Sequence, residues 1–107
     1  MGEEEGAKEL TAEVISDARR IAGFSLSPNG ELAAYAVYPF SQREEHAVSA
    51  IWLASRGAAA RQLTFGTAED HAPRWSVDGS TLYFLSDRAK RGTAQLYCIS
   101  PAGGEAV

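Results

Sequence analysis

The chain has 107 residues, of which 45% are hydrophobic and 22% charged, proportions typical of one small globular unit. Its net charge of −4 comes mostly from residues 1–9, so residues 10–107 carry 9 basic against 10 acidic side chains and no basic stripe for a nucleic acid. The first residues lack the pattern of a signal peptide, and no stretch is as long and apolar as a membrane span. We therefore expect a cytoplasmic protein without nucleic-acid or membrane partners.

The first 22 residues divide into two segments. Residues 1–9 contain almost no apolar side chains and predict a flexible acidic tail. Residues 10–22 predict a short helix whose apolar residues are Leu10, Val14, Ala18 and Ile21. Their spacings of four, four and three line one helical face, and Gly23 is a natural stop.

From Gly23 onwards, short apolar runs separated by turns predict antiparallel strands. The expected strands are Phe24–Leu26, Leu32–Tyr38, Val48–Ala54, Ala60–Thr64, Pro73–Trp75, Thr81–Leu85 and Ala94–Ile99. Residues 32–38 and 82–85 are apolar at every position rather than at alternate ones, which predicts strands covered on both faces. The aromatic residues expected in the core are Trp52, Trp75, Tyr83, Phe84 and Tyr97.

The chain also repeats itself. Ser27-Pro28-Asn29-Gly30 returns 49 residues later as Ser76-Val77-Asp78-Gly79, and Ile51-Trp52-Leu53 returns 45 residues later as Leu96-Tyr97-Cys98. A repeat of roughly 40 to 50 residues, made of short strands and tight turns, is the pattern of β-propeller blades.

We therefore predict a mainly β fold made of the first two blades of a β-propeller, preceded by the short helix. Residues 23–66 are the first four-stranded antiparallel blade, and residues 67–107 are the second, which is incomplete in its last strand. Because closed propellers have about four to eight blades, the chain is expected to be the front part of a longer protein.

Among the candidate site residues, His46 and Cys98 have two readings each. His46 follows Glu44 and Glu45, and this group could ligate zinc, but the polar tip of a hairpin explains it better. Cys98 is the only cysteine, which excludes an intrachain disulfide, and its apolar strand predicts a packed core thiol rather than a nucleophile.

A second group of polar residues lies in the second repeat. His71 follows Glu69 and Asp70 and could titrate or face a channel, but the segment is typical of a polar lead-in to a strand. Asp87 and Arg88 could bind a substrate terminus, although an ion pair or turn contact between neighbouring strands explains them better. We predict no catalytic, cofactor-binding or metal-ligating residue in this chain.

The second repeat carries a family resemblance. The stretch from His71 to Arg88, followed by Leu96-Tyr97 and Gly103-Gly104-Glu105, resembles the WD-like propeller repeat of the prolyl oligopeptidase family of serine peptidases. Residues 26–35 and the strand Arg61-Gln62-Leu63-Thr64 are similar to that family's first blade. The resemblance covers roughly residues 11–107 and is strongest to the acylaminoacyl-peptidase and dipeptidyl-aminopeptidase-like branch.

This resemblance implies a propeller that caps a C-terminal α/β-hydrolase domain, which this chain does not contain. The hydrolase domain would be its partner, and the propeller would admit short peptides while excluding folded proteins. No catalytic residue is carried over, because the Gly-x-Ser-x-Gly turn of the nucleophile is absent. The nearest match, Gly23-Phe24-Ser25-Leu26-Ser27, ends in serine and leads into a hairpin. The chain alone is therefore expected to be catalytically silent and to need no cofactor.

Two alternatives remain open from the sequence. One is a non-enzymatic propeller that serves as a binding scaffold, similar to the periplasmic component of outer-membrane translocation systems. The other is a small β-sheet module that completes its ring by self-association into a homo-oligomer.

Overall fold

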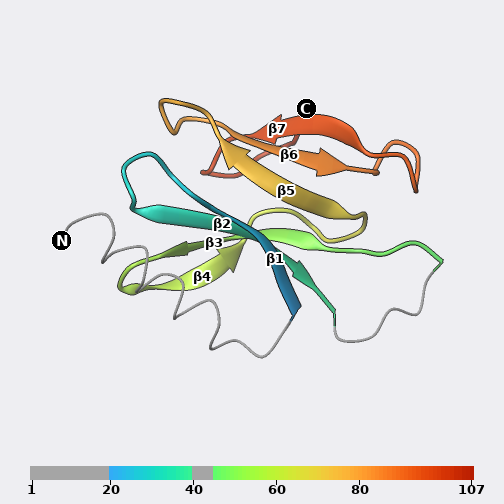
Figure 1. Ribbon diagram of the computed structural model, residues 1–107, viewed down its shortest axis with the longest axis horizontal. Coiled ribbons are helices and arrows are strands. Elements are labelled where there is room, and N and C mark those ends of the chain that lie inside the picture. The colour runs from blue at the N-terminus through green and yellow to red at the C-terminus, as the bar shows by residue number, and fades with distance from the viewer. Residues whose placement is uncertain (1–19, 40–44) are drawn as a thin grey trace.

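The computed structural model describes residues 20–39 and 45–107, and these residues form two antiparallel β-sheets (Figure 1). The first sheet has the strand order β1-β2-β3-β4 and the second the order β5-β6-β7, so neighbours in sequence are neighbours in space. Within these ranges no helix is present, and accordingly none that could span a membrane. The described part of the chain is therefore mainly β, as predicted.

The observed strands follow the predicted ones closely. Their bounds are β1 Arg20–Leu26, β2 Leu32–Tyr38, β3 Ala50–Ser55, β4 Ala58–Gln62, β5 Asp70–Trp75, β6 Leu82–Ser86 and β7 Gln95–Ile99. Each of the seven predicted runs overlaps one of these strands. Short apolar runs separated by turns thus predict the positions of the strands.

The C-terminal end of the predicted helix is wrong. Arg20 and Ile21 belong to β1, where Ile21 pairs with Val37 of β2, while residues 10–19 and the predicted tail lie outside the described residues. Backbone pairing with β2 outweighs the helical spacing of the apolar side chains, since propensity yields to tertiary context. The guanidinium of Arg20 lies 4.3 Å from the centre of the Tyr38 ring, within the range of a cation–π contact.

Gly23 does not end a helix but lies in a β-bulge between β1 and β2, with φ of +66°. The pairing of β5 with β6 is interrupted at the same point of the second repeat, where Ala72 has φ of +53°. Gly23 and Ala72 are 49 residues apart, the same offset as the repeated turns. Both first strands thus bulge through one left-handed residue, which glycine adopts freely and alanine does not.

Substitutions at Gly23 and at Ala72 are expected to have opposite effects on the free energy of unfolding. Ala72→Gly is expected to raise the free energy of unfolding by about 0.5 kcal/mol, because relief of about 1–2 kcal/mol of left-handed strain exceeds the added flexibility of the unfolded chain. Gly23→Ala is expected to lower it by about 1–3 kcal/mol. Its Cβ would also lie 3.1 Å from Cδ of Pro73. Urea denaturation of both variants measures the effects, and a loss of stability in Ala72→Gly would contradict the strain argument.

The repeated turns have the same hydrogen bonds in both copies. In the first, the Ser27 hydroxyl donates to Oδ1 of Asn29 at 2.8 Å and accepts from the Leu32 amide at 3.0 Å. In the second, the Ser76 hydroxyl donates to Oδ1 of Asp78 at 2.8 Å and accepts from the Thr81 amide at 3.1 Å. Asparagine and aspartate therefore fill one structural role, which is the Asx acceptor of a tight turn.

The pKa of Asp78 is lowered from 3.8 to about 2 by hydrogen bonds from the amide and the hydroxyl of Ser80 and then from the hydroxyl of Ser76. Because the folded pKa lies below the unfolded one, this carboxylate stabilises the fold fully above about pH 4 and loses its contribution as the pH falls towards 2. Carboxyl NMR titration is expected to find a midpoint near 2 for Asp78, and a higher one in Ser80→Ala. A midpoint near 3.8 in the unmodified chain would contradict these hydrogen bonds.

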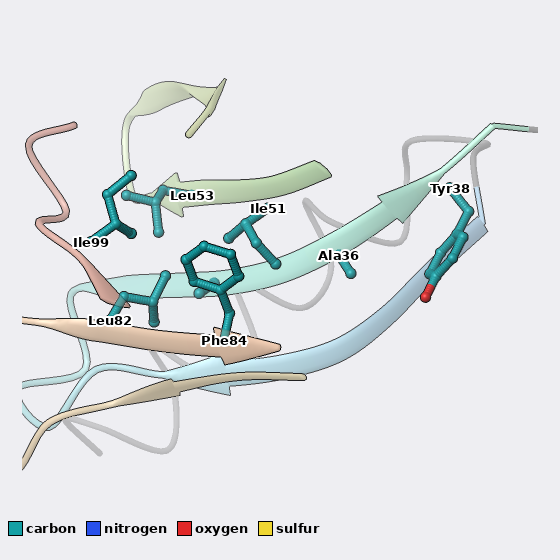
Figure 2. Packing of buried hydrophobic residues seen from close by; sticks show 8 residues of the cluster. Ala36, Tyr38, Ile51, Leu53, Leu82, Phe84 and Ile99 are labelled. Atoms are coloured by element: carbon teal, nitrogen blue, oxygen red, sulfur yellow. The ribbon is translucent and has the colours of Figure 1, made fainter. Parts of the chain in front are cut away.

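The two sheets pack face to face around one core. Its buried side chains are Ala34, Ala36, Tyr38, Ile51 and Leu53 from the first sheet and Leu82, Phe84 and Ile99 from the second (Figure 2). The other face of the first sheet buries a smaller cluster, Ala33, Tyr35, Val37 and Ala54. Strand β2 is therefore covered on both faces, as its continuous apolar run predicts.

Strand β6 does not share this double coverage. Leu82 and Phe84 are fully buried, but Tyr83 between them is 40% exposed, so its predicted place in the core is wrong. Successive side chains of a strand point to opposite faces, and only one face of the second sheet packs on the first. Of the other aromatic residues expected in the core, Trp75 and Tyr97 are partly buried against it, and Trp52 packs against the smaller cluster on the other face of the first sheet.

A further residue pairs with the outer strand of the second sheet. The amide of Val107 donates to the Cys98 carbonyl at 3.0 Å, and the Cys98 amide donates to the Val107 carbonyl at 2.9 Å. In the first sheet, Arg61 of β4 pairs with Leu53 of β3, the counterpart of Cys98. Val107 thus occupies a position of the expected fourth strand of the second sheet.

Candidate functional site

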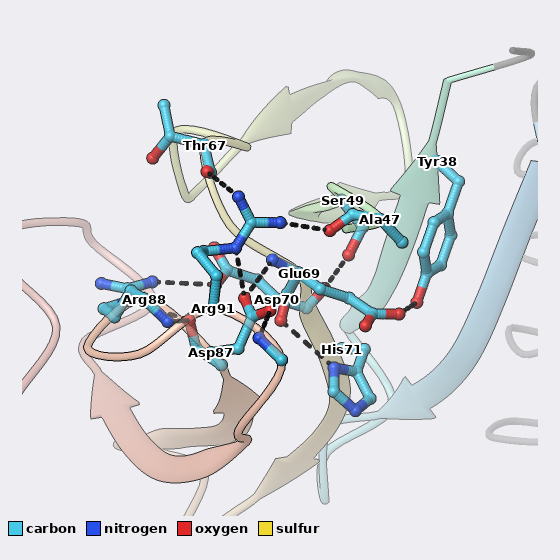
Figure 3. A network of polar contacts seen from close by, with 12 residues as sticks. Tyr38, Ala47, Ser49, Thr67, Glu69, Asp70, His71, Asp87, Arg88 and Arg91 are labelled. Carbon is cyan, nitrogen blue, oxygen red and sulfur yellow. Dashed lines mark hydrogen bonds and ion pairs between the residues drawn. The ribbon is translucent and has the colours of Figure 1, made fainter. Parts of the chain in front are cut away.

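The polar residues singled out in the second repeat come together where the two sheets meet (Figure 3). Asp70 begins β5 with only 2% of its surface exposed, and its Oδ1 accepts a hydrogen bond from Nη2 of Arg88 at 3.1 Å. The Nε of Arg88 donates to the Ser86 hydroxyl at 3.0 Å. The sequence predicts an ion pair or turn contact between neighbouring strands, and Arg88 makes it with Asp70.

Arg88 is also placed by two aromatic rings. Its guanidinium carbon lies 5.2 Å from the centre of the Phe84 ring and 4.9 Å from that of the Tyr97 ring. Cation–π attraction and the ion pair therefore hold the same group between the core and the sheet edge.

Asp87 is the second buried carboxylate of the site. Its Oδ1 accepts from the Glu69 amide and its Oδ2 from the Gly92 amide, both at 2.8 Å. Nε of Arg91 lies 3.2 Å from Oδ1 in an ion pair without hydrogen-bond alignment. Burial raises the pKa of Asp87, but the Gly92 and Glu69 amides and then Arg91 outweigh it and hold this pKa at about 2.

Arg91 extends the network to the first sheet. Its Nη2 donates to the Ala47 carbonyl at 2.7 Å, and its Nη1 to the Thr67 carbonyl at 3.4 Å. The loop after β6 is thereby attached both to the segment before β3 and to the connection between the sheets. A single side chain joins three segments that are distant in sequence.

Ser49 and Glu69 complete the junction from the other side. They form an isolated parallel bridge, and the Ser49 hydroxyl donates to the Asp70 carbonyl at 2.6 Å. The Tyr38 hydroxyl donates to Oε2 of Glu69 at 2.7 Å. Burial, and then this hydrogen bond, raise the pKa of Tyr38. We call the set of Tyr38, Ser49, Glu69, Asp70, Asp87, Arg88 and Arg91 the junction network.

The contacts of the junction network fasten the two sheets to each other. Nδ1 of His71 lies 3.2 Å from the Glu69 carbonyl, and among the described residues no hydroxyl hydrogen bond reaches a histidine. A cavity of about 130 Å³ lies beside Asp70 and Arg88. A second cavity, lined in part by Tyr38 and Ser49, measures about 430 Å³, within the range of about 300–1,000 Å³ of typical ligand pockets. The carboxylate of Asp70 accepts from a guanidinium group and that of Asp87 from two amides, while Glu69 accepts from the Tyr38 hydroxyl. Such charge-assisted hydrogen bonds suit a structural lock.

The remaining candidates are also placed by the structure. His46 is half-buried and packs against Gly92, so it is less solvated than the predicted hairpin tip, and Glu44 lies outside the described residues. Within the described ranges no group of three His, Cys, Asp or Glu could hold a metal ion. Cys98 is half-buried rather than packed in the core. Gly103 closes a turn through its amide to the Ser100 carbonyl at 2.9 Å.

The sequence analysis did not single out Arg91, which joins three segments of the site. Arg91 lies in a polar loop whose composition predicts only a solvated turn, and its acceptors are backbone carbonyls that carry no residue signature. The link between Tyr38 and Glu69 was missed for a similar reason, because the two residues are 31 positions apart.

The known proteins with similar sequences are peptidases. The chain is 36% identical over 100 residues to the uncharacterized peptidase YuxL of Bacillus subtilis, covering 92% of this chain and 15% of that protein. It is 36% identical over 95 residues to dipeptidyl-peptidase 5 of Porphyromonas endodontalis, covering 88% of this chain and 14% of the relative. No family model matches the chain.

A solved structure with a similar fold is that of a propeller protein. A TolB-like protein from Agrobacterium tumefaciens superposes with a TM-score of 0.64 and 24% identity, covering 81% of this chain and 29% of that one. At this identity the likeness shows the fold alone. The two antiparallel sheets thus have the arrangement found in a propeller, and the sequence relatives are several times longer than this chain.

Proposed function

We propose that this chain forms two adjacent blades of a propeller that controls peptide access to a serine hydrolase domain. The premise of this proposal is that the chain is an N-terminal propeller segment of the prolyl oligopeptidase family. The observation that carries the proposal is a combination of two findings in one chain. Its sequence relatives are peptidases, and its repeated unit forms two sheets that pack face to face. To the intact protein we assign the activity of a dipeptidyl-peptidase or an acylaminoacyl-peptidase.

A substrate filter must be rigid, and the packing of the described residues fits this requirement. The core of eight buried side chains and the junction network hold the sheets in one arrangement. The indole Nε1 of Trp75 adds a hydrogen bond of 3.0 Å to the Ser25 carbonyl, which joins β5 to β1. In this proposal the hydrolase domain supplies the nucleophile and its base.

In this proposal β1 and β5 face the central channel. Each is the edge strand of its sheet, pairing with only one described neighbour, and the two are linked by Trp75. A channel lined by such edges would admit an extended oligopeptide and exclude a folded domain on size alone.

The test is to express the natural protein that contains this chain and to treat it with a fluorophosphonate serine probe. We expect labelling at a serine outside residues 1–107, and cleavage of short peptides but not of casein or a folded protein. A chain-length series of peptides locates the size limit. Labelling within residues 1–107, or no labelling of the active natural protein, would overturn the peptidase assignment.

A second candidate is favoured by the TolB-like neighbour, which carries the same fold. In that case the propeller would be a binding scaffold without a hydrolase domain. The natural protein would then resist the serine probe and be recovered in a stable complex with another protein.

A further inference from the structure

The two repeated turns differ in one reactive side chain. The first contains Asn29 followed by Gly30, and the second contains Asp78 followed by Gly79. An asparagine before glycine is prone to attack by the next backbone nitrogen, because glycine has no Cβ to shield that nitrogen or to restrict its rotation. Asp78, whose pKa is about 2, is a carboxylate at neutral pH and resists the same attack. Of the two turns, the first is therefore the reactive one.

The reaction at Asn29 consumes water and releases ammonia. The Gly30 nitrogen loses its proton and bonds to Cγ of Asn29, while the bond from Cγ to the side-chain nitrogen breaks and that nitrogen takes up a proton and leaves as ammonia. The product is a cyclic imide, which water opens at either of its carbonyl carbons. Attack at Cγ gives aspartate, and attack at the backbone carbonyl carbon gives isoaspartate, whose main chain runs through Cβ and Cγ.

The folded turn engages both reacting groups in hydrogen bonds. Asn29 is exposed, whereas Gly30 is buried and its amide donates to the Ser27 carbonyl at 2.9 Å. Oδ1 of Asn29 accepts from the Ser27 hydroxyl at 2.8 Å and from the Glu31 amide at 3.0 Å. The attack removes the Gly30 proton and turns the Asn29 side chain, so it breaks these three hydrogen bonds.

We infer that Asn29 is a modification site, converted to aspartate without an enzyme at a rate set by local opening of the turn from Ser27 to Gly30. Local opening frees the groups of a turn from their partners. Each of the three hydrogen bonds should slow the conversion by about two- to tenfold, so the folded protein should react about 100-fold more slowly than an unstructured peptide. The inference concerns the chemistry of this turn and does not depend on peptidase activity.

The second turn shows how the product fits. Oδ1 of Asp78 accepts from the Ser76 hydroxyl at 2.8 Å and from the Ser80 amide at 3.0 Å, the same two contacts that Oδ1 of Asn29 makes. Aspartate in the first turn therefore keeps these contacts and adds a negative charge at an exposed site. Isoaspartate lengthens the main chain within the turn and should break its closing hydrogen bond.

The test is to incubate the natural protein that contains this chain beside a synthetic peptide of residues 21–43, at a mildly alkaline pH that removes amide protons more readily. Trypsin releases the same segment from the protein, since Arg20 precedes it and Arg43 ends it. Mass spectrometry of the segment follows the loss of the side-chain amide over time. We expect conversion in the peptide, and conversion about 100-fold slower in the folded protein. Hydrogen exchange of the Gly30 and Glu31 amides should show protection of the same size, because both processes need the turn to open.

Matched variants separate the turn from overall stability. Ser27→Ala removes the hydroxyl that binds Oδ1 of Asn29 and should speed the conversion by about two- to tenfold in the folded protein but not in the peptide. Ser76→Ala removes the equivalent hydroxyl of the second turn and should leave the rate unchanged. Asn29→Asp carries the side chain of the product and should keep the urea midpoint of the parent.

Several results would overturn the inference. Equal rates in the folded protein and in the peptide would show that the turn does not control the reaction, and a lack of conversion in both would show that Asn29 is not a modification site. Equal acceleration by Ser27→Ala and Ser76→Ala would assign the reaction to global unfolding. If Ser27→Ala does not fold, hydrogen exchange of the parent decides, and a mismatch of more than about tenfold between protection and slowing contradicts the inference.

Discussion

Phe84→Ala is expected to lower the free energy of unfolding by about 3–5 kcal/mol, the cost of removing a fully buried phenylalanine from a core. Phe84 has no exposed surface, and its ring lies between the two sheets, 6.2 Å from that of Tyr97 (Figure 2). A domain of this size has about 5–15 kcal/mol of stability in total, so the variant should be largely unfolded at moderate urea concentrations.

The control for this prediction is the neighbouring residue of the same strand. Tyr83→Ala removes an aromatic side chain of similar size from the opposite face, where it is 40% exposed. We expect it to cost less than about 1.5 kcal/mol in the 107-residue chain, because most of the cavity term is absent. Equal midpoints of urea denaturation for the two variants would show that the sheets do not pack through Phe84.

Asp87→Ala is expected to cost about 3–5 kcal/mol, because it leaves the Arg91 guanidinium in a half-buried place without its counter-charge. The substitution also strands the Glu69 and Gly92 amides, which donate to the two carboxylate oxygens. Asp87→Asn keeps the shape but offers only one acceptor oxygen, so it should be destabilised by a smaller amount. Calorimetric melting of the two variants and the parent measures both effects.

The Asp87 carboxylate also accounts for part of the stability that the fold loses in acid. Its folded pKa of about 2 lies below the unfolded value, so its contribution is complete above about pH 4 and is lost as the pH falls towards 2. The difference in stability between the parent and Asp87→Asn should therefore shrink between about pH 4 and pH 2. A constant difference across this range would mean that the carboxylate is not held ionised by its neighbours.

The sequence predicts the elements of this fold well because they are specified locally. Serine and an Asx residue close each repeated turn through side-chain hydrogen bonds, and the apolar run 32–38 marks a strand that is buried on both faces. The prediction fails at Arg20 and Ile21, where a helical spacing of side chains is overruled by pairing with β2. It also fails at Tyr83, because an apolar run cannot say whether a second layer is present.

The candidate site is less predictable for a different physical reason. Glu69, Asp70, Asp87 and Arg88 are visible as polar clusters in the sequence, but their partners are set by the crossing of two sheets. One of these partners, Arg91, donates to the backbone carbonyls of Ala47 and Thr67. Every residue type carries such a carbonyl, so no spacing rule identifies the acceptor.

The paired bulges at Gly23 and Ala72 affect how this chain behaves towards other polypeptides. A straight edge strand presents a regular row of unpaired amides and carbonyls and is a template for strand addition and amyloid-like association. One left-handed residue in each first strand interrupts that row and twists the edge. In the proposed channel, an extended peptide that passed β1 or β5 would meet a broken ladder and would not be captured as an additional strand.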